Sequence, residues 1–426
     1  MKINIKDSPA LLLLLLPLAI ISGPFFSDLF IIIIDLWFLN RILKDKDLKK
    51  KYINNNKIFL YFLIFNIYII IVSLFSENLM FSLKSSFFYF RFYIFALAMC
   101  FIFDTFKFSI RYFFYSISFA IILILLSAQY ELIVIKDYFN NTQENLRAFN
   151  RISGLFGDEL IMGSVLKNFF VIFLVLFFYL NFNEKKYVNT WLILFIFFTI
   201  TFTILISGER TSIFIYLIFS LISGFILRNK INFFKISVIS CIAFIFLILN
   251  FDNLRSRVID FTITQVTNNQ VILDDERKVI ERDKEKFLYL SVDHDAHART
   301  AIEMFLEKPL FGYGPKNFRN VCKRFEYNRF SCTTHPHNIY LQILSETGLI
   351  GLFFLIVGIL NLLNFLRNKF NKKDDISFKI LTTYLLIFFI PFLPSGNFFN
   401  NFFNINLYMI IGLYLYFLMN FENNQK

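Results

Sequence analysis

Long apolar segments recur along the whole 426-residue chain, and they constrain its fold more than any other feature. A helix that spans a bilayer needs about 17–25 consecutive, predominantly apolar residues. Segments that meet or approach this length lie at residues 9–22, 25–43, 58–75, 86–104, 108–128, 162–181, 190–207, 211–227, 235–251, 348–366, 378–395 and 403–420. The sequence therefore predicts an all-α, polytopic integral membrane helical bundle with about twelve transmembrane helices.

The first two of these segments admit more than one interpretation. Segment 9–22 is short, so with segment 25–43 it forms either two spans or a re-entrant hairpin across Ser22-Gly23-Pro24. Lys2 and Lys6 ahead of an apolar run are typical of a signal peptide, but no small-x-small cleavage site follows convincingly. An uncleaved first span is therefore predicted.

Basic residues gather in alternate loops, and this asymmetry predicts the orientation of the chain. One set of loops carries Lys44, Lys46, Lys49, Lys50, Lys51, Lys57, Lys107, Arg111, Lys185, Lys186, Arg228, Lys230, Arg367, Lys369, Lys372 and Lys373. The opposite short loops carry only Lys84 and Arg210. Because cytoplasmic loops are enriched in Lys and Arg, we expect the first set and both termini to be cytoplasmic. The net charge of +12 thus reflects membrane topology and not a nucleic-acid partner.

One long polar stretch divides the chain. We expect an N-terminal membrane region at 1–251 with about nine spans, a large helical periplasmic loop at 252–337, and a C-terminal membrane region at 338–426 with about three spans. Within the loop, Asp274–Lys286 is dense in both charges and predicts a solvated helix. Cys322 and Cys332 lie in the same loop. They would form a disulfide in an oxidising compartment and otherwise remain two thiols.

The end of this loop holds the strongest candidate for chemistry, His337. Pro336 suits the first turn of a helix, so we expect a helix that starts with His337 and Asn338 at the membrane surface and ends or kinks at Gly348. The positive end of that helix would lower the pKa of His337 and keep its ring neutral. A neutral imidazole can take the proton of a hydroxyl group, although a histidine at a helix start is often a hydrogen-bonding cap.

The other histidines raise the alternative of a metal site. His294, His297 and His335 share the loop with His337, and Asp293 and Asp295 lie nearby. Neither histidine pair has the i,i+4 spacing of a helical zinc motif, and a proline separates the second pair. The zinc alternative is therefore weaker, and no metal ligands are predicted.

Four arginines fall on the same predicted membrane face as His337, namely Arg147, Arg151, Arg210 and Arg299. A guanidinium binds phosphate in a bidentate manner and stays charged when partly desolvated, so such a cluster suits a lipid-linked diphosphate. Each arginine alone has the alternative of snorkelling or of an ion pair, as between Arg210 and Glu209. The sequence has no phosphate-binding glycine loop, so an already activated substrate would have to supply the driving force.

Four motifs carry a family resemblance. His337-Asn338 is followed after nine residues by Gly348-Leu349-Ile350-Gly351, and Arg299 precedes Pro309-Leu310-Phe311-Gly312-Tyr313-Gly314-Pro315-Lys316-Asn317-Phe318. Ser207-Gly208-Glu209-Arg210-Thr211 forms an S-G-x-R-T motif, and Arg151–Phe156 an R-x-x-G-x-F motif. Together they make residues 147–360 resemble the O-antigen ligase family, which shares its membrane domain with some polysaccharide polymerases and O-linked oligosaccharyltransferases. Phe214 stands where ligases often have Leu, which weakens a choice of ligase over these relatives.

The resemblance implies a metal-independent, cofactor-free inverting glycosyltransferase of the bacterial inner membrane. Its donor would be a glycan on undecaprenyl diphosphate, and its acceptor lipid A–core or another glycan. His337 would activate the acceptor, Arg210 and Arg299 would bind the diphosphate, and substrate contacts would come from Arg151, Arg147, Asn338 and Glu209. The first hypothesis is an O-antigen ligase of lipopolysaccharide biosynthesis. The alternatives are an O-antigen or exopolysaccharide polymerase, a protein O-oligosaccharyltransferase and, from another class, a transporter, which would have paired broken helices at mid-bilayer.

Overall fold

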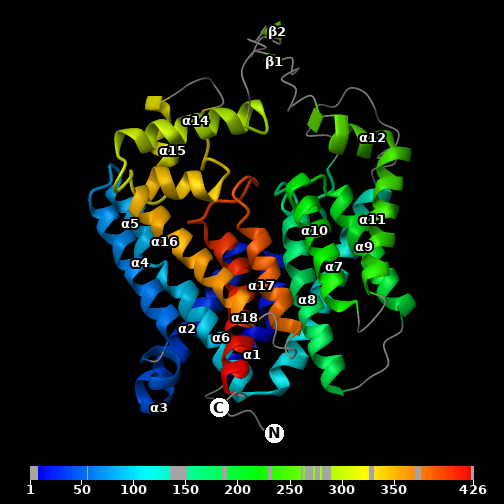
Figure 1. Cartoon of the computed structure of the whole chain (residues 1–426), viewed down its shortest axis with the longest axis horizontal. Coiled ribbons are helices and arrows are strands. Elements are labelled where there is room, and N and C mark those ends of the chain that lie inside the picture. The colour runs from blue at the N-terminus through cyan, green and yellow to red at the C-terminus, as the bar shows by residue number, and fades with distance from the viewer. Residues whose placement is uncertain are drawn as a thin grey trace.

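The computed structural model describes residues 8–54, 56–134, 151–184, 190–228, 233–260, 262–263, 272–273, 279–280, 289–325, 331–369 and 376–423. Over these residues the chain is a bundle of long helices, with both termini at one end and α14 and α15 at the other (Figure 1). The long helices are α1 (Pro9–Ser22), α2 (Pro24–Lys44), α4 (Lys57–Leu74), α5 (Leu79–Phe87), α6 (Phe90–Thr105), α7 (Phe108–Val134), α8 (Met162–Glu184), α9 (Thr190–Ile206), α10 (Arg210–Leu227), α11 (Phe233–Asn250), α14 (Val292–Glu307), α16 (Ile339–Lys369), α17 (Ile376–Phe388) and α18 (Asn401–Asn423).

Each of the predicted membrane segments contains a helix. Eight helical segments of the described chain are long and apolar enough to cross a membrane, with α5 and α6 counted together, and α1, α9 and α17 are shorter apolar helices. Gly23, with a φ of 124°, separates α1 from α2, and the two helices pack against each other. The prediction of a polytopic helical membrane protein is confirmed.

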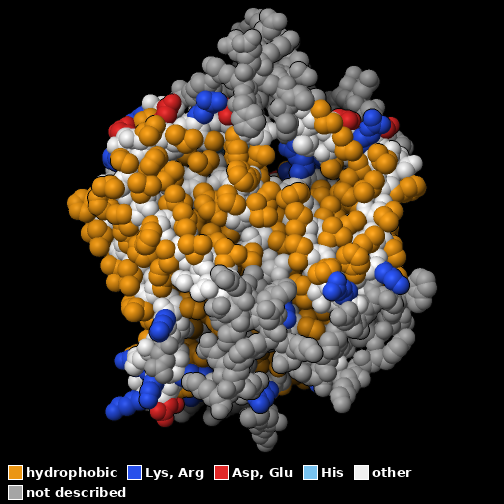
Figure 2. All heavy atoms as spheres, in the orientation of Figure 1, with side chains coloured by type: hydrophobic (Ala, Val, Ile, Leu, Met, Phe, Trp, Pro, Cys, Tyr) orange, Lys and Arg blue, Asp and Glu red, His pale blue; other side chains and the backbone are white. Residues whose placement is uncertain are grey.

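The surface of the bundle agrees with this assignment. Hydrophobic side chains cover the middle of the molecule in Figure 2, whereas Lys and Arg side chains gather towards its two ends. Large side chains such as Leu126, Ile242 and Phe353 are exposed by more than 60%. A contiguous apolar belt of this extent is what a helical bundle presents to lipid. Inside the belt, α6 and α18 pack along each other and are largely buried.

Shorter elements connect the long helices. They are α3 (Lys46–Lys49), η2 (Lys50–Asn54), η3 (Gly154–Phe156), α12 (Asp252–Arg255), η4 (Ser256–Asp260), β1 (Ile272–Leu273), β2 (Val279–Ile280), α15 (Phe318–Val321) and η5 (Cys322–Phe325). The two strands pair antiparallel. The predicted helix over Asp274–Lys286 was therefore wrong at Val279–Ile280, and its other residues lie outside the described part of the chain.

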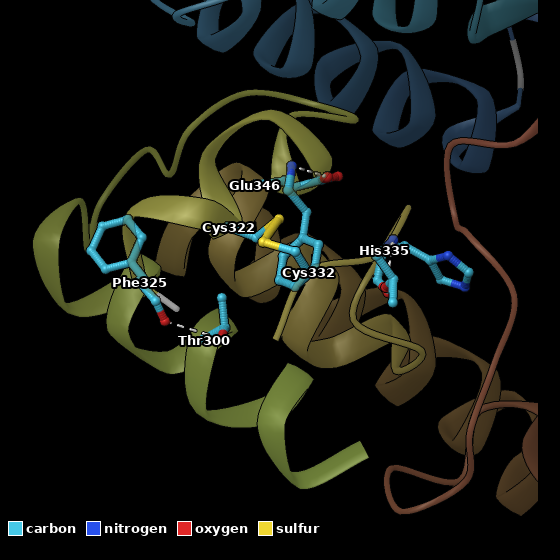
Figure 3. The surroundings of a disulfide bond; sticks show 8 residues. Thr300, Cys322, Phe325, Cys332, His335 and Glu346 are labelled. Atoms are coloured by element: carbon cyan, nitrogen blue, oxygen red, sulfur yellow. Dashed lines mark hydrogen bonds between the residues drawn. A yellow bond between two sulfur atoms is a disulfide. The ribbon is translucent and has the colours of Figure 1, made fainter. Parts of the chain in front are cut away.

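A small cap of α14, α15 and η5 covers α16 at the end opposite the termini (Figure 1). It has its own core, formed by Ala301, Met304, Tyr313, Phe318, Val321 and Cys322. A disulfide joins Cys322 to Cys332, which lie 5.3 Å apart between Cα atoms, close to His335 and Glu346 (Figure 3). Since α11 ends at Asn250 and α16 begins at Ile339, we propose that the loop at 252–337 separates membrane regions 1–251 and 338–426.

The loop before the cap is joined to a kink in α16. Gly348 interrupts the helix with a φ of 67°, as the sequence predicted, and a Cβ there would lie 2.2 Å from the Leu310 carbonyl oxygen. The Leu349 N–H donates to the Pro309 carbonyl at 2.8 Å, and the Gly314 N–H to the Glu346 carbonyl at 2.7 Å. Only glycine permits this approach of two backbones, which fixes the loop that leads to α15.

Candidate active site

A cavity of about 1490 Å³ opens beside α8 and α10 and reaches the histidines of the cap. Figure 2 shows basic side chains gathered in a hollow on this side of the molecule. Its charged lining residues are the basic Arg151, Lys167, Arg210, Arg257, Lys316 and Arg319 and the acidic Glu159 and Glu209. The cavity is larger than the roughly 300–1,000 Å³ of most small-molecule sites. Its size and its excess of positive charge suit a large anionic ligand.

The backbone at His337 differs from the prediction. α16 begins at Ile339, so the predicted helix start at Pro336 and His337 was wrong. His337 instead adopts a left-handed conformation with a φ of 53°, and its carbonyl accepts the Ser395 N–H at 2.8 Å. The Asn338 Oδ1 caps the helix by accepting the N–H groups of Tyr340 at 2.9 Å and Leu341 at 3.1 Å. This cap leaves the His337 ring at the wall of the cavity.

All four histidine rings lie together. The centroid of the His337 ring is 4.1 Å from that of His335, 5.4 Å from His297 and 5.9 Å from His294. The His335 Nε2 lies 3.2 Å from the Ser395 carbonyl oxygen, and the His294 Nδ1 lies 2.6 Å from the Ser291 Oγ. Within the described ranges, no group of three or more His, Cys, Asp or Glu side chains has the geometry to hold a metal ion.

Burial keeps the rings of His294, His335 and His337 neutral at pH 7. It lowers the pKa of His294 to about 4, of His335 to about 3 and of His337 to about 4. For His337 the neighbouring His297 lowers the pKa further, while Asp293 opposes the shift. The direction agrees with the sequence prediction, but the main cause is desolvation and not the end of a helix.

Three arginines gather at the turn between α9 and α10. The Arg151 Nε donates to the Ser207 carbonyl at 2.9 Å and its Nη2 to the Leu160 carbonyl at 3.0 Å. The Arg257 Nε donates to the Gly208 carbonyl at 3.3 Å, and the Arg210 Nη1 to the Thr262 Oγ1 at 3.0 Å. Arg210 repels both Arg151 and His294 electrostatically, so this arginine cluster lies beside the histidine rings. It unites the predicted Arg151 and Arg210 with Arg257, which sequence reasoning missed.

Three other predicted site residues form hydrogen bonds with groups of the protein itself. The Arg299 Nε donates to the Asp295 Oδ2 at 2.7 Å, one helical turn back along α14, and Arg299 is not among the residues that line the cavity. Glu209 lines it, but its carboxylate accepts the N–H groups of Gly163 at 2.6 Å and Ser164 at 3.0 Å at the start of α8. The Asn338 Nδ2 donates to the Pro391 carbonyl at 2.7 Å. Arg147 lies outside the described residues.

Three further cations of the cavity escaped the sequence analysis. Lys167 lies on α8 with only 5% of its surface exposed, and its Nζ is 6.0 Å from the centroid of the Tyr384 ring. A lone lysine inside an apolar span is itself a sign of function, and this signal was present in the sequence. Lys316 and Arg319 follow the Gly312–Pro315 turn, where no local pattern marks a side chain that faces a cavity.

Comparison with known proteins identifies a family model. No curated protein matches the chain. The family model described as O-Antigen ligase matches residues 195–356, which include Arg210, Arg257, all four histidines and the kink at Gly348. The match confirms the resemblance that the motifs indicated. Over residues 195–356, the chain is therefore similar to the O-antigen ligase family.

Proposed function

We propose that the protein is a membrane glycosyltransferase that moves a glycan from a polyprenyl diphosphate to a hydroxyl group, and first of all an O-antigen ligase with lipid A–core as acceptor. The observation that carries the proposal is the neutral His337 ring beside the cluster of Arg151, Arg210 and Arg257 in one large cavity. The family match supports the class of reaction.

The arginine cluster is suited to the leaving group. As the bond between the sugar C1 and the phosphate oxygen breaks, its electron pair leaves with the diphosphate, which needs positive charge. Arg151 and Arg257 are held by the backbone carbonyls of Ser207 and Gly208, so their guanidinium groups are oriented before substrate binds. We assign diphosphate binding to these two and to Arg210. Because they supply the positive charge, we propose that the transfer needs neither a metal nor a cofactor.

His337 is suited to the acceptor. In the same step the acceptor oxygen forms its bond to C1, which inverts the configuration, and its proton passes to a nitrogen of the His337 ring. Burial alone would leave that ring a weak base, since it lowers the pKa to about 4. A bound diphosphate would raise the pKa by adding negative charge nearby, so the ring would gain basicity only when the donor is present.

For three other predicted residues, Asn338, Glu209 and Arg299, we propose roles that differ from the direct substrate contacts first expected. Asn338 caps α16 and Glu209 caps α8, so we assign both to positioning the residues beside them, His337 and Arg210. Arg299 shares a face of α14 with Asp295 and not with His294 and His297. Contact between Arg299 and diphosphate would therefore come from its Nη groups, with the Nε held by Asp295.

We also propose that the cavity opens on the periplasmic face of a bacterial inner membrane, with both termini cytoplasmic. The disulfide between Cys322 and Cys332 supports an oxidising compartment for the cap. The termini lie at the opposite end of the bundle, the end that also holds the lysine-rich α3 (Figure 1).

A deletion strain complemented with variants tests the function. We expect His337→Gln to abolish attachment of the surface polysaccharide, and the surface variant Lys323→Gln to restore it. Loss of a ligase would give core without polymer, together with polymer on its lipid carrier. Loss of a polymerase would give core that bears a single repeat unit. Full attachment with His337→Gln at normal protein levels would refute the assignment.

A further inference from the structure

Lys316 and Arg319 form a second basic site in the cavity, beside a different histidine from the arginine cluster. Arg210 acts electrostatically on His294, whereas Arg319 acts on His335. The His337 ring neighbours both of these histidines, 5.9 Å from one and 4.1 Å from the other between centroids. Two ring neighbours of His337 therefore feel two different groups of basic side chains.

Within the described residues, neither cation of this second site is in an ion pair, although the Glu346 and Asp28 carboxylates attract Lys316 at longer range. In the described part of the chain, neither Lys316 nor Arg319 has an ion pair within 4.0 Å, whereas nearby Arg91 is paired with Asp28 at 2.7 Å. The Arg319 Nε is buried without a hydrogen-bond partner, and its guanidinium lies 5.4 Å from the centroid of the Phe81 ring. Burial, followed by repulsion from Arg319, lowers the pKa of Lys316. A bound anion would stabilise the positive charges of Lys316 and Arg319, which burial and mutual repulsion destabilise.

The backbone is built to hold this pair in place. Lys316 has a φ of 62°, a conformation that non-glycine residues adopt at a cost and often at functional sites. The fully buried Glu346 fixes it, because one carboxylate oxygen accepts the Lys316 N–H at 2.9 Å and the other accepts the Phe318 N–H at 2.9 Å. The Gln342 Nε2 donates to Glu346 at 3.1 Å and to Asn397 at 2.9 Å, which connects the clamp to the 391–397 segment that also lines the cavity.

We propose that Lys316 and Arg319 bind a phosphate group of the acceptor lipid while Arg151, Arg210 and Arg257 bind the diphosphate of the donor. The inference rests on the proposed function. Two anionic lipids would then be held beside His337, which brings the acceptor hydroxyl to the sugar C1. The phosphate can belong to lipid A–core or to a second polyprenyl diphosphate glycan.

Kinetics of the full chain in liposomes test the proposal. We compare Lys316→Asn, which removes the charge but tolerates a positive φ, Arg319→Gln, and the exposed Lys323→Gln as a control. We expect each of the first two to raise the acceptor KM about 10-fold or more, with kcat and donor KM within about twofold. A rise in donor KM, or no change in acceptor KM, would overturn the proposal.

The acceptor arms identify the source of the phosphate. With lipid A–core, removing its phosphates should raise the wild-type acceptor KM as much as Lys316→Asn does, and the two changes should not add. With a polyprenyl diphosphate glycan as acceptor, the acceptor KM of the wild type for the corresponding monophosphate is compared with the acceptor KM of Lys316→Asn for the diphosphate. Additive effects in both arms would show that Lys316 does not contact the acceptor phosphate.

Binding without turnover separates failure of this inference from failure of the proposed function. The purified chain in detergent is titrated with farnesyl diphosphate and, separately, with diphosphoryl lipid A. If the acceptor is lipid A–core, Lys316→Asn and Arg319→Gln should weaken lipid A binding and leave farnesyl diphosphate binding intact, and Arg210→Gln should do the reverse. If the acceptor is a polyprenyl diphosphate glycan, farnesyl diphosphate should bind at two sites, one weakened by Arg210→Gln and the other by Lys316→Asn and Arg319→Gln. Either pattern in a chain that transfers no glycan would refute the function and retain the second site. Equal effects of all three variants on both probes would refute the second site itself.

Discussion

The rings of His335 and His337 lie 4.1 Å apart between centroids, yet they differ in how they are held. The His335 Nε2 is 3.2 Å from the Ser395 carbonyl oxygen and its Nδ1 is 2.9 Å from the Thr334 Oγ1. For the His337 ring, the described residues provide no hydrogen-bond partner, and the ring lines the cavity half-buried. His335 therefore holds the 391–397 segment in place, while the nitrogens of His337 are left for a substrate.

This difference predicts opposite effects of two substitutions. His337→Gln should reduce glycan transfer by about 10²-fold or more, since it removes the proton acceptor, and should leave the melting temperature in detergent within about two degrees. His335→Ala should lower the melting temperature because it removes the hydrogen bond to Ser395. Transfer by the reconstituted protein and thermal unfolding measure the two effects. A variant at His337 that unfolds early but transfers normally when folded would reverse the assignment.

The buried histidines predict how stability depends on pH. The pKa values of His294, His335 and His337 fall from about 6.5 in an unfolded chain to about 4, 3 and 4 in the folded chain. Between pH 6.5 and about 4 the unfolded chain binds more protons, so stability decreases as the pH falls through this window. Above pH 6.5 these groups add no pH dependence.

Thermal unfolding in detergent between pH 4.5 and 7.5 measures this slope. His335→Asn should flatten it, because one of the three suppressed protonation sites is gone. The pH dependence of kcat/KM reports the free enzyme, so its acid limb should lie near pH 4 and not near 6.5. A midpoint of unfolding that is constant from pH 7 to pH 5 would contradict the neutral, buried state of the rings.

The sequence predicted the membrane helices well because span length and apolar content are local properties. It also predicted that the helix ends or kinks at Gly348, because the tendency of glycine to interrupt a helix is a local property too. It misplaced the start of α16, since the preference of Pro336 for a first helical turn was overridden by the contact between the His337 carbonyl and Ser395, 58 positions away. Arg319 faces the cavity because Glu346, distant in the sequence, holds the loop that carries it, which a local pattern does not reveal. The ion pair between Arg299 and Asp295 also depends on the folded structure, and it engages a side chain that the sequence assigned to diphosphate.

The kink itself gives a third prediction, with a matched control in the same helix. Gly348→Ala places a methyl group 2.2 Å from the Leu310 carbonyl at a positive φ, so it should destabilise the protein by more than about 1 kcal/mol. Gly358→Ala, farther along α16, has open space with the nearest atom at 4.0 Å and should be neutral or stabilising. Unfolding midpoints of the two variants measure the contrast. Equal midpoints would mean that the 309–314 loop does not depend on this close approach.

Lys167 gives the last prediction, in which stability and activity should change in opposite directions. Its ammonium lies in an almost fully buried position on α8, beside the Tyr384 and Phe388 rings, and a charge there costs free energy of folding. Lys167→Met keeps the aliphatic stem and removes the charge, so the melting temperature should rise or stay constant. If the ammonium attracts the anionic donor into the cavity, the donor KM should rise about 10-fold in the same variant. Lys235→Met, at an exposed position of α11, should change neither quantity. A Lys167→Met protein with a lower melting temperature and an unchanged donor KM would instead place the lysine among the groups that hold α8 against α17, because a residue kept for binding is one whose loss the fold tolerates and the reaction does not.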